Sequence, residues 1–347
     1  MRVAKYYNND DVRIEEMPVP KIGDEDLLVK VIASGICGSD VMEWYRIKKA
    51  PLVLGHEITG NIVEVGAGVS GYKVGDRVFV SHHVPCNNCH YCDFDNHTAC
   101  ETLHTTNYDP GGFAEYLRVP KINVERGTFL LPKEISYEEG VFIEPLACVV
   151  RDQRKADFKA GQSVLILGSG LAGLLHMMLA KANGAERVVV TDVNEARLKL
   201  AKELGADAVI KATEDIPSNF RKINDGLLAD QVVICTGAKS VFEQALGSVD
   251  RGGTVMFFAP TEPGVNLEIP VNDFWRNAVK LMPSYGAGLD DIKSAIGIIA
   301  EKKIGVEKLI THRLKLDEAG KGFKLVADAK ECMKVILLPH PNDAKSV

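Results

Sequence analysis

The segment around residues 163–173 constrains the fold most strongly. The apolar run SVLIL is predicted to be a buried strand, and it leads directly into GSGLAG, which opens an apolar helix. The first glycine permits a tight turn, the second lets the backbone approach a pyrophosphate, and the third lets helix and strand pack closely. The helix N-terminus adds unpaired N–H groups that attract phosphate. A bare G-x-G-x-x-G is a weak signal, but this context predicts a dinucleotide site. The residues expected to line it are Gly168, Gly170, Leu171, Ala172 and Gly173.

Strands and helices continue to alternate after this motif, which predicts an α/β fold with a doubly wound parallel sheet. Before about residue 150 the chain shows short strands and Gly-rich corners instead, which predicts a compact, barrel-like β domain. A length of 347 residues fits two domains. We therefore predict a first domain at 1–150, a nucleotide-binding domain at 151–285, and a segment at 286–347 that returns to the first domain. In the second domain we expect strands at 163–167, 187–191, 207–210, 231–234 and 254–258, and helices at 171–183, 194–204 and 239–249.

The choice of dinucleotide follows from Asp192, which ends the second strand 24 positions beyond Gly168. A carboxylate there can accept hydrogen bonds from the adenosine ribose and would repel a 2′-phosphate. The next residue, Val193, is not the Arg or Lys that would bind that phosphate, so NAD is predicted rather than NADP. The alternative role for Asp192 is a solvated N-cap of the next helix. Arg197, one turn into that helix, either reaches the ribose or is a solvated helix residue.

Four of the eight cysteines lie within fifteen residues. Four converging thiolates saturate a structural zinc ion, which holds a loop and leaves no position for chemistry. Disulfides are one alternative, but the opening MRVAKYYNN lacks the apolar core of a secretory signal, so a reducing, cytoplasmic environment is expected. A nucleic-acid-binding zinc knuckle is the other. Residues 82–101 contain no Lys or Arg and the net charge is −6, which disfavours a phosphate backbone. The predicted structural ligands are Cys86, Cys89, Cys92 and Cys100.

Other metal-ligand types are spread through the first domain. Cys37 lies in CGSD, His56 and Glu57 lie in GHE, and Glu144 lies in EPL. Each residue alone would be a packing or surface residue. Together, Cys, His and carboxylate are the ligand types of an open catalytic zinc, whose fourth position is left for water or substrate. The open position predicts a small-molecule substrate. No apolar run approaches the roughly 18–20 residues of a membrane span, so a membrane partner is not expected.

These segments together resemble the zinc-dependent medium-chain alcohol dehydrogenases, and most closely their polyol (sorbitol) and threonine dehydrogenase branch. The likeness covers essentially the whole chain, through CGSD, GHE, the cysteine quartet, GGFAEY, EPL and GSGLAG in that order. It implies a GroES-like β-barrel catalytic domain beside a Rossmann NAD-binding domain. It also implies two zinc ions per chain, one catalytic and one structural, and a homo-oligomer, with a tetramer favoured over a dimer.

The resemblance also assigns the metal ligands. Cys37 and His56 match ligands of the catalytic zinc, and Glu144 matches the glutamate that serves as third ligand in this branch. Glu57 is the competing carboxylate, in or just outside the coordination shell. Asp40 matches the position that orients the ligating histidine, a role that metal chemistry also requires.

One position departs from the family pattern. Ser39 matches a hydroxyl that relays the released proton, with a simple turn-capping role as its alternative. Many relatives then carry a histidine where this chain has Met42, so the outward path of the proton is in question. Cys148, Cys235 and Cys332 fit no ligand position and are expected to be core residues.

The substrate follows less directly. Trp44, Tyr45 and His83 are candidates for lining its pocket, although each could equally be packing. The segment LMPSYGAGLDDI lacks the arginine that threonine dehydrogenases carry there, so a sugar alcohol or another vicinal diol is expected. The alternatives are a threonine or other amino-alcohol dehydrogenase and, more distantly, a non-catalytic NAD-binding protein. A metal-free reductase of the same superfamily should lack both cysteine sets and Asp192, which this chain has.

Overall fold

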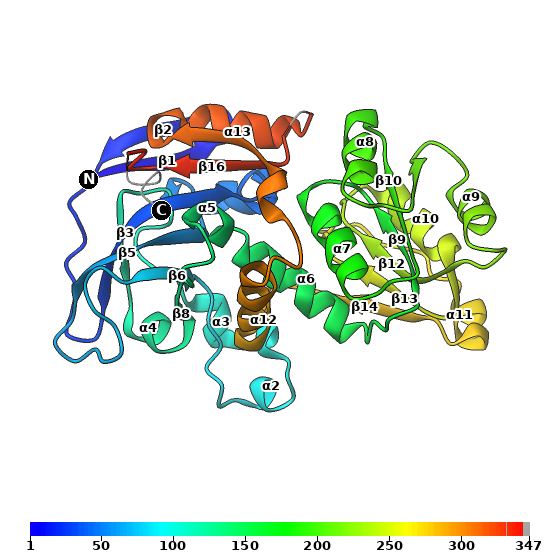
Figure 1. The fold of residues 1–347 in the computed structure, drawn as a ribbon, viewed down its shortest axis with the longest axis horizontal. Coiled ribbons are helices and arrows are strands. Elements are labelled where there is room, and N and C mark those ends of the chain that lie inside the picture. The colour runs from blue at the N-terminus through cyan, green and yellow to red at the C-terminus, as the bar shows by residue number, and fades with distance from the viewer. Residues whose placement is uncertain (331, 343–347) are drawn as a thin grey trace. The chain divides into compact units, whose positions relative to one another are not determined.

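A computed structural model of the chain describes residues 1–330 and 332–342 (Figure 1). The chain divides into two units. One consists of Met1–Ala147 with Ala287–Val347, and the other of Cys148–Gly286. In this division the C-terminal segment belongs to the first unit, because its strands complete a sheet there.

The first unit is built on two sheets. The larger has the order β15-β16-β3-β5-β6-β8, with β7 also pairing with β3, and the smaller has the order β2-β1-β4. Nine of the ten residues of β3 are buried, so it is a central strand. β16 runs antiparallel to β3 with Ile336 opposite Gly35, which brings a C-terminal strand beside the segment that leads to Cys37. The strands are β1 (Arg2–Asn8), β2 (Asp11–Glu16), β3 (Leu27–Ile36), β4 (Leu52–Val53), β5 (Glu57–Val65), β6 (Arg77–Ser81), β7 (Tyr116–Val119), β8 (Thr128–Leu130), β15 (Ile310–Lys315) and β16 (Lys334–Leu338).

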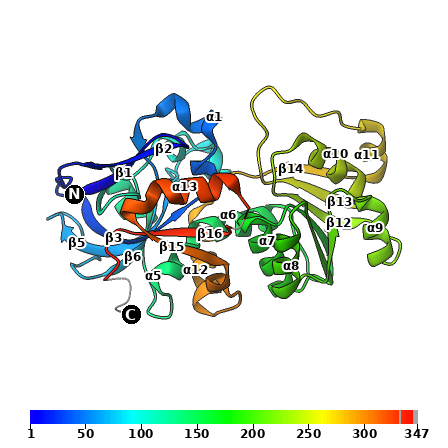
Figure 2. The same ribbon diagram turned by 90° about the horizontal axis from the view of Figure 1, so that it is seen from above.

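The helices of the first unit connect these strands, and α13 packs on β2 and β16 (Figures 1 and 2). They are α1 (Glu43–Arg46), α2 (His90–Asp93), α3 (Glu101–Thr105), α4 (Lys121–Gly127), α5 (Tyr137–Gly140), α12 (Leu289–Ala300) and α13 (Ala319–Asp328). Short 3-10 turns occur at Gly38–Asp40, Ile47–Lys49, His97–Ala99, Val306–Leu309 and Leu316–Glu318.

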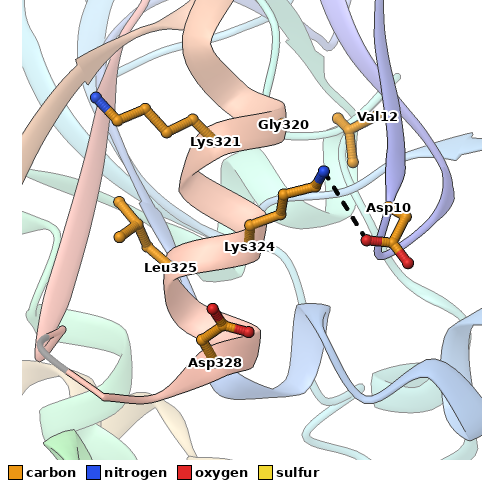
Figure 3. A pocket seen from close by; sticks show the side chains of 7 residues that line it. All are labelled: Asp10, Val12, Gly320, Lys321, Lys324, Leu325 and Asp328. Atoms are coloured by element: carbon orange, nitrogen blue, oxygen red, sulfur yellow. Dashed lines mark ion pairs between the residues drawn. The ribbon is translucent and has the colours of Figure 1, made fainter.

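An open hollow of 410 Å³ lies between α13 and the β1–β2 hairpin (Figure 3). On one side Lys324 Nζ lies 3.9 Å from Asp10 Oδ1. The lining residues include no histidine or cysteine. The hollow is therefore separate from every candidate metal ligand.

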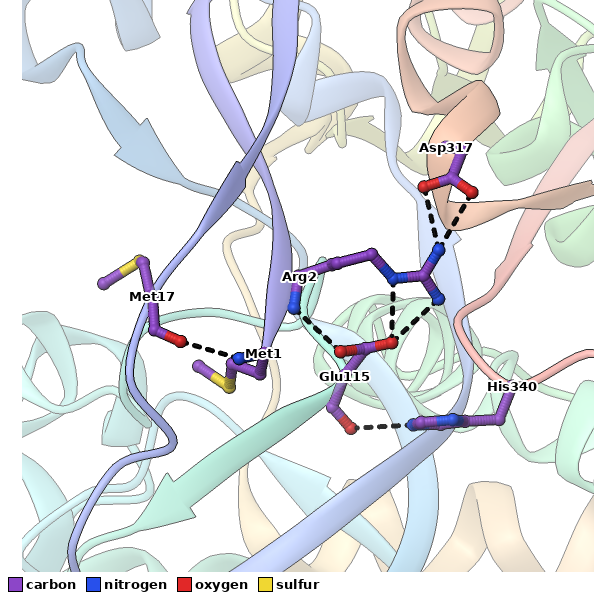
Figure 4. A network of polar contacts seen from close by, with 6 residues as sticks. All are labelled: Met1, Arg2, Met17, Glu115, Asp317 and His340. Carbon is purple, nitrogen blue, oxygen red and sulfur yellow. Dashed lines mark hydrogen bonds and ion pairs between the residues drawn. The ribbon is translucent and has the colours of Figure 1, made fainter.

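Arg2 ties the N-terminal strand to two distant segments (Figure 4). Its Nε and Nη2 donate to Glu115 Oε1 at 2.9 and 2.8 Å, and its Nη1 lies 2.9 Å from Asp317 Oδ2. The backbone carbonyl of Glu115 lies 3.3 Å from His340 Nε2. The start of the chain is thus joined to the C-terminal segment within one unit.

The second unit contains a six-stranded sheet in the order β11-β10-β9-β12-β13-β14, with every pair parallel. The doubly wound sheet predicted from the sequence is confirmed. Its strands are β9 (Ser163–Leu167), β10 (Arg187–Asp192), β11 (Ala208–Lys211), β12 (Ala229–Ile234), β13 (Val249–Phe257) and β14 (Lys280–Pro283). Its helices are α7 (Leu171–Ala182), α8 (Glu195–Glu203), α9 (Ile216–Ile223), α10 (Lys239–Ser248) and α11 (Val271–Asn277), while α6 (Ile143–Lys155) runs from the first unit into the second.

Two local expectations were wrong. β13 begins at Val249 rather than at 254, because Gly252 and Gly253 lie within the strand rather than in a turn before it, and the register with β12 shifts near its start. The region before residue 150 is also not all β, because α6 already begins at Ile143. Pro145 lies in the first turn of that helix, where a missing N–H removes no helical hydrogen bond.

Candidate metal centres and dinucleotide loop

The first candidate centre brings together Cys37, His56 and Glu57. Cys37 directly follows β3, and Glu57 begins the neighbouring strand β5. One potential ligand atom from each residue lies within 4.8 Å of the others. Glu57 is fully buried, and its Oε1 has no hydrogen-bond partner among residues 1–330 and 332–342. A sulfur, an imidazole nitrogen and a buried carboxylate oxygen in need of a partner fit the ligand preferences of zinc.

Asp40 orients His56, as a second-sphere carboxylate should. Its Oδ1 lies 3.4 Å from His56 Nδ1, and its Oδ2 accepts from the backbone N–H of Cys37 at 3.0 Å. Burial alone would raise the pKa of the Asp40 carboxyl, but His56 and then Arg46 bring that pKa below its usual value. With Nδ1 directed at Asp40, Nε2 of His56 is left for a metal.

A lysine from the far end of the chain completes this region. Lys334 of β16 is fully buried, and its Nζ forms an ion pair with Glu57 Oε2. Gly35 leaves the necessary space, because a Cβ there would lie 2.1 Å from Glu57 Oε2 and 2.7 Å from Lys334 Cε. Sequence reasoning missed Lys334. The available signal was a cation in the otherwise apolar strand KVILL, since a lysine is almost never fully buried without a partner.

Glu144, the favoured third ligand, is not in the group of three. It lies in the first turn of α6 and is half-buried. Its charge is nonetheless felt at Tyr108, whose pKa is raised well above its usual value by burial and then by Glu144, Asp40 and Glu57. The structure therefore gathers Glu57 with Cys37 and His56, and gives Glu144 a place close enough to influence the same tyrosine.

Ser39 is held by Arg46, another residue that the sequence did not single out. Arg46 Nη2 donates to Ser39 Oγ at 3.2 Å and Arg46 Nε donates to the Ser39 carbonyl at 2.9 Å. The Ser39 hydroxyl keeps its own proton to donate elsewhere. Met42 precedes α1 and offers no group that could accept a proton at neutral pH.

The three residues expected to line the substrate pocket, Trp44, Tyr45 and His83, lie in two places. The ring centroids of Trp44 and Tyr45 lie 5.8 Å apart on α1 with the rings tilted by 56°, and Tyr45 is 38% exposed. His83 lies against His82 at 3.8 Å, and the His82 ring lies 4.9 Å from His56. Burial lowers the pKa of His83 to about 4. His82 thus connects His83 to the candidate metal centre, a link that its position in the sequence did not reveal.

The cysteine quartet forms a second candidate centre. One sulfur from each residue lies within 4.8 Å of the others, and none of the eight cysteines is in a disulfide, all eight being within the described residues. The Cys86 N–H points at Cys100 Sγ at 3.3 Å. Apart from these cysteines, the buried cluster of this lobe contains only Leu103. So small a core needs a metal or a covalent link to hold its loop.

The dinucleotide loop occupies the expected place between β9 and α7. A Cβ on Gly173 would lie 1.9 Å from the Gly168 carbonyl, so the third glycine is needed for close packing. Asp192 Oδ2 accepts from the N–H and the hydroxyl of Ser169 at 2.8 and 2.9 Å. The N-cap of α8 is Asn194, not Asp192. Arg197 Nη1 lies 3.8 Å from the position of a Cβ on Gly170, which places its guanidinium beside the loop.

Among the helices in the described ranges 1–330 and 332–342, none has both the length and the apolar character needed to cross a membrane.

The chain is similar to known proteins over nearly its whole length. The family pattern described as "Alcohol dehydrogenase GroES-like domain" matches residues 23–128, and the one described as "Zinc-binding dehydrogenase" matches residues 172–301. Sorbitol dehydrogenase of Mus musculus is 33% identical over 344 residues, which cover 96% of this chain and 94% of that protein. The crystal structure of 2R,3R-butanediol dehydrogenase from Bacillus subtilis has a TM-score of 0.86 and 29% identity, and the match covers 98% of this chain and 99% of that one. A protein from Sinorhizobium meliloti 1021, whose crystal structure was solved with bound NADP, has a TM-score of 0.84 and 27% identity, and the match covers 97% of this chain and 99% of that one.

Proposed function

Because the chain belongs to the zinc-dependent medium-chain alcohol dehydrogenases, in their polyol dehydrogenase branch, we propose that it oxidises a secondary alcohol of a polyol or similar vicinal diol to the ketone, with NAD as hydride acceptor. The fold class predicted from the sequence, a GroES-like domain with a Rossmann-type α/β domain, is confirmed. The observation that carries the proposal is the convergence of Cys37, His56 and Glu57 in a chain that also holds a dinucleotide loop.

The residues of the first unit have distinct roles in this proposal. Cys37 and His56 hold the catalytic metal, and Glu57 is the carboxylate favoured as third ligand by its position in the group of three. Glu144 is the competing carboxylate. A zinc ion bound there would supply a Lewis acid that polarises the alcohol oxygen. Ser39 would relay the alcohol proton, accepting it on its hydroxyl oxygen while passing its own hydroxyl proton on to water, and Arg46 holds that hydroxyl in place.

NAD is proposed over NADP because of the buried carboxylate of Asp192. It is 8% exposed and its Oδ2 is held by Ser169, while Val193 beside it is 69% exposed and carries no positive charge. A ribose 2′-phosphate would meet the Asp192 carboxylate, and Val193 offers it no counter-ion. Arg197, beside Gly170, is positioned for the ribose or the pyrophosphate. The NADP-bound relative shows that this fold can hold NADP, so the affinity of this chain for each dinucleotide must be measured.

The substrate class is proposed from the relatives that act on sorbitol and butanediol. The test is a screen of polyols, sugar phosphates, amino alcohols and simple secondary alcohols with NAD+ and with NADP+, followed by absorbance of the reduced dinucleotide. We expect the highest kcat/KM with a vicinal diol and NAD+. A clear preference for threonine would replace the substrate class. Absence of reaction with every alcohol, together with binding of zinc and NAD+, would favour the non-catalytic alternative.

Metal content tests the site itself. We expect two zinc ions per chain in the wild type and one in Cys37→Ala, which should also lose alcohol oxidation while keeping NAD+ binding. Cys332→Ala is the matched control, because Cys332 is 5% exposed and lies in an apolar core cluster. One zinc ion per chain in the wild type, unaffected by Cys37→Ala, would contradict the catalytic centre.

We also propose a cellular location and an oligomeric state. Four cysteines that serve as zinc ligands must stay reduced, which fits the cytoplasm. A homo-oligomer is supported by the open edge of β14 in the second unit and by the exposed apolar side chains of α11, and a tetramer rather than a dimer is proposed from the family resemblance alone. There Val271 is 70% and Trp275 is 80% exposed.

A further inference from the structure

The second unit contains a buried acid–base pair that the proposed reaction does not use. Asp152 lies on α6 and His176 on α7, and both side chains are fully buried, with Asp152 Oδ2 3.6 Å from His176 Nε2. Neither carboxylate oxygen of Asp152 and neither ring nitrogen of His176 forms a well-aligned hydrogen bond with the described residues. Two buried polar groups without such bonds are costly to keep, so a role in folding alone does not account for them.

The pair lies at the edge of the sheet where doubly wound folds bind their ligands. Cys235, Phe258 and Ser284 follow the carboxyl ends of β12, β13 and β14 in turn. The Phe258 ring packs edge-on against His176 at 4.7 Å, and the Cys235 thiol and the Ser284 hydroxyl both interact with Asp152. Ligands of such sheets bind outside these strand ends.

The same cluster reaches the dinucleotide loop. A Cβ on Gly168, the first glycine of the loop, would lie 3.4 Å from the backbone of Cys235. His176 lies on the helix that the loop opens, one turn beyond Gly173. The carboxyl of Asp152 is therefore buried just behind the backbone that is proposed to hold the cofactor.

We propose that the Asp152–His176 pair sets the relative affinity of this unit for the oxidised and the reduced dinucleotide, through the presence or absence of one negative charge on Asp152. The inference rests on the proposed cofactor. The oxidised nicotinamide ring carries one positive charge more than the reduced ring, and the two cofactors otherwise share the same phosphates and riboses. A carboxylate in a low-dielectric interior attracts that extra charge, and a protonated carboxyl does not.

The charge of Asp152 changes in the physiological range. Burial raises its pKa to about 7, and burial lowers the pKa of His176 to about 3. The pair is thus a neutral imidazole beside a carboxyl that ionises near neutrality, rather than a fixed ion pair. The other groups that face Asp152 do not titrate there. Desolvation and Asp152 itself raise the pKa of the Cys235 thiol well above its usual value, and Phe258 and Ser284 carry no charge.

The charged neighbour of Asp152 on α6 is Arg151. His176 is also the only histidine between residues 148 and 286. The second unit therefore has no other imidazole that could imitate the effect.

The test measures dissociation constants of NAD+ and NADH at pH 6 and pH 8, by calorimetry, on the full-length protein. As the pH rises, Asp152 ionises and NAD+ should gain on NADH, with the ratio Kd(NADH)/Kd(NAD+) increasing about three- to tenfold. Asp152→Asn should remove this increase. Asp157→Asn is the matched control, because Asp157 lies five positions later, its side chain is 70% exposed, and its positive φ of 54° suits asparagine. It should behave as the wild type.

A purely structural role for Asp152 predicts a different result. Asp152→Asn would then weaken both dinucleotides equally and leave the pH dependence of the ratio unchanged, which overturns the proposal. A ratio independent of pH in the wild type overturns it as well. His176→Gln is a second variant in case Asp152→Asn does not fold. It keeps the Asp152 carboxyl, so it should shift the midpoint of the pH dependence of the ratio without abolishing that dependence. If neither NAD+ nor NADH binds, the proposed cofactor is wrong. The same measurement with NADP+ and NADPH then tests the role of the Asp152–His176 pair.

Discussion

At the scale of single residues, the ion pair between Lys334 and Glu57 gives the sharpest prediction. Both side chains are fully buried, so removal of the lysine leaves a carboxylate without a counter-ion. In the zinc-free protein, Lys334→Met should lower the free energy of unfolding by about 3–5 kcal/mol, measured by urea unfolding. Lys334→Arg should retain most of the stability. The double variant Glu57→Gln with Lys334→Met should recover part of the loss, because no charge then remains buried. Equal stability of the wild type and Lys334→Met would contradict a charged pair.

Asp152 gives a second prediction at this scale, on stability rather than on binding. Its pKa is raised from 3.8 to about 7, so the folded state favours the protonated form. The stability that this carboxyl contributes is fully present below pH 4 and is lost as the pH rises through about 7. Relative to the wild type, Asp152→Asn should therefore gain stability between pH 5 and pH 8, by about 2–3 kcal/mol. Thermal melting of both proteins at the two pH values measures it. A difference between the two proteins that stays constant with pH would show that Asp152 does not titrate in this range.

Neither of the two buried pairs, Lys334–Glu57 and Asp152–His176, was predicted from the sequence. Cys37, His56 and Glu57 were predicted, because each lies in a short motif whose residue types suggest a metal. Lys334 lies 277 positions from Glu57, and only the pairing of β16 with β3 brings them together. Asp152 and His176 each lie in a helix whose pattern suggests ordinary packing. A buried partner across two helices leaves no local signal.

At the scale of elements, the cysteine lobe at residues 86–105 contains short helices that cannot fold on apolar contacts alone. α2 and α3 have four and five residues, and the lobe's buried cluster adds only Leu103 to its cysteines. Helices of this length are not stable in isolation. The lobe also meets α12, because a Cβ on Gly288 would lie 3.2 Å from His97 Nδ1. Loss of order in the lobe should therefore reach the helix that begins beside it.

Cys89→Ser tests this dependence. We expect loss of one zinc ion per chain, faster proteolysis within residues 86–105, and a lower melting temperature, with alcohol oxidation lost only as far as folding is lost. Cys332→Ser, in the apolar core of the first unit, should keep both zinc ions. Unchanged zinc content in Cys89→Ser, or loss of activity in a protein with intact fold and resistance to protease, would contradict a structural role for the quartet.

Elements were predicted best where the pattern is local. β9 was predicted to the residue, and α7 to within one residue, because the apolar run and the glycine loop mark their ends. The start of β13 was missed because Gly252 and Gly253 signal a turn in sequence, whereas the neighbouring strand β12 keeps them in the sheet. α9 and α11 were not predicted. None of the residues of α11 is buried, so its sequence shows no helical period of apolar residues.

At the scale of the whole molecule, the sheet of the second unit ends in two edge strands, β11 and β14, and we consider the β14 edge. Within the described residues β14 pairs with β13 alone, so its other backbone groups can hydrogen-bond to another strand. Nearby in sequence, α11 carries two of the most exposed apolar side chains of the described residues, Val271 and Trp275. Exposed apolar area of this kind marks contact surfaces. A two-fold axis beside β14 would let two copies satisfy both features with the same surface.

Sedimentation of the wild type and of Trp275→Glu measures this assembly. The wild type should sediment as an oligomer, and Trp275→Glu should shift it toward smaller species, because a carboxylate would be buried against an apolar partner surface. Val74→Glu is the matched control, since Val74 is 62% exposed on the first unit and the same charge is introduced. It should leave the assembly intact. A monomeric wild type would refute the proposed oligomer. An oligomer unchanged by Trp275→Glu would place the contact on another surface, and dissociation caused equally by Val74→Glu would show that added charge, rather than the α11 surface, is responsible.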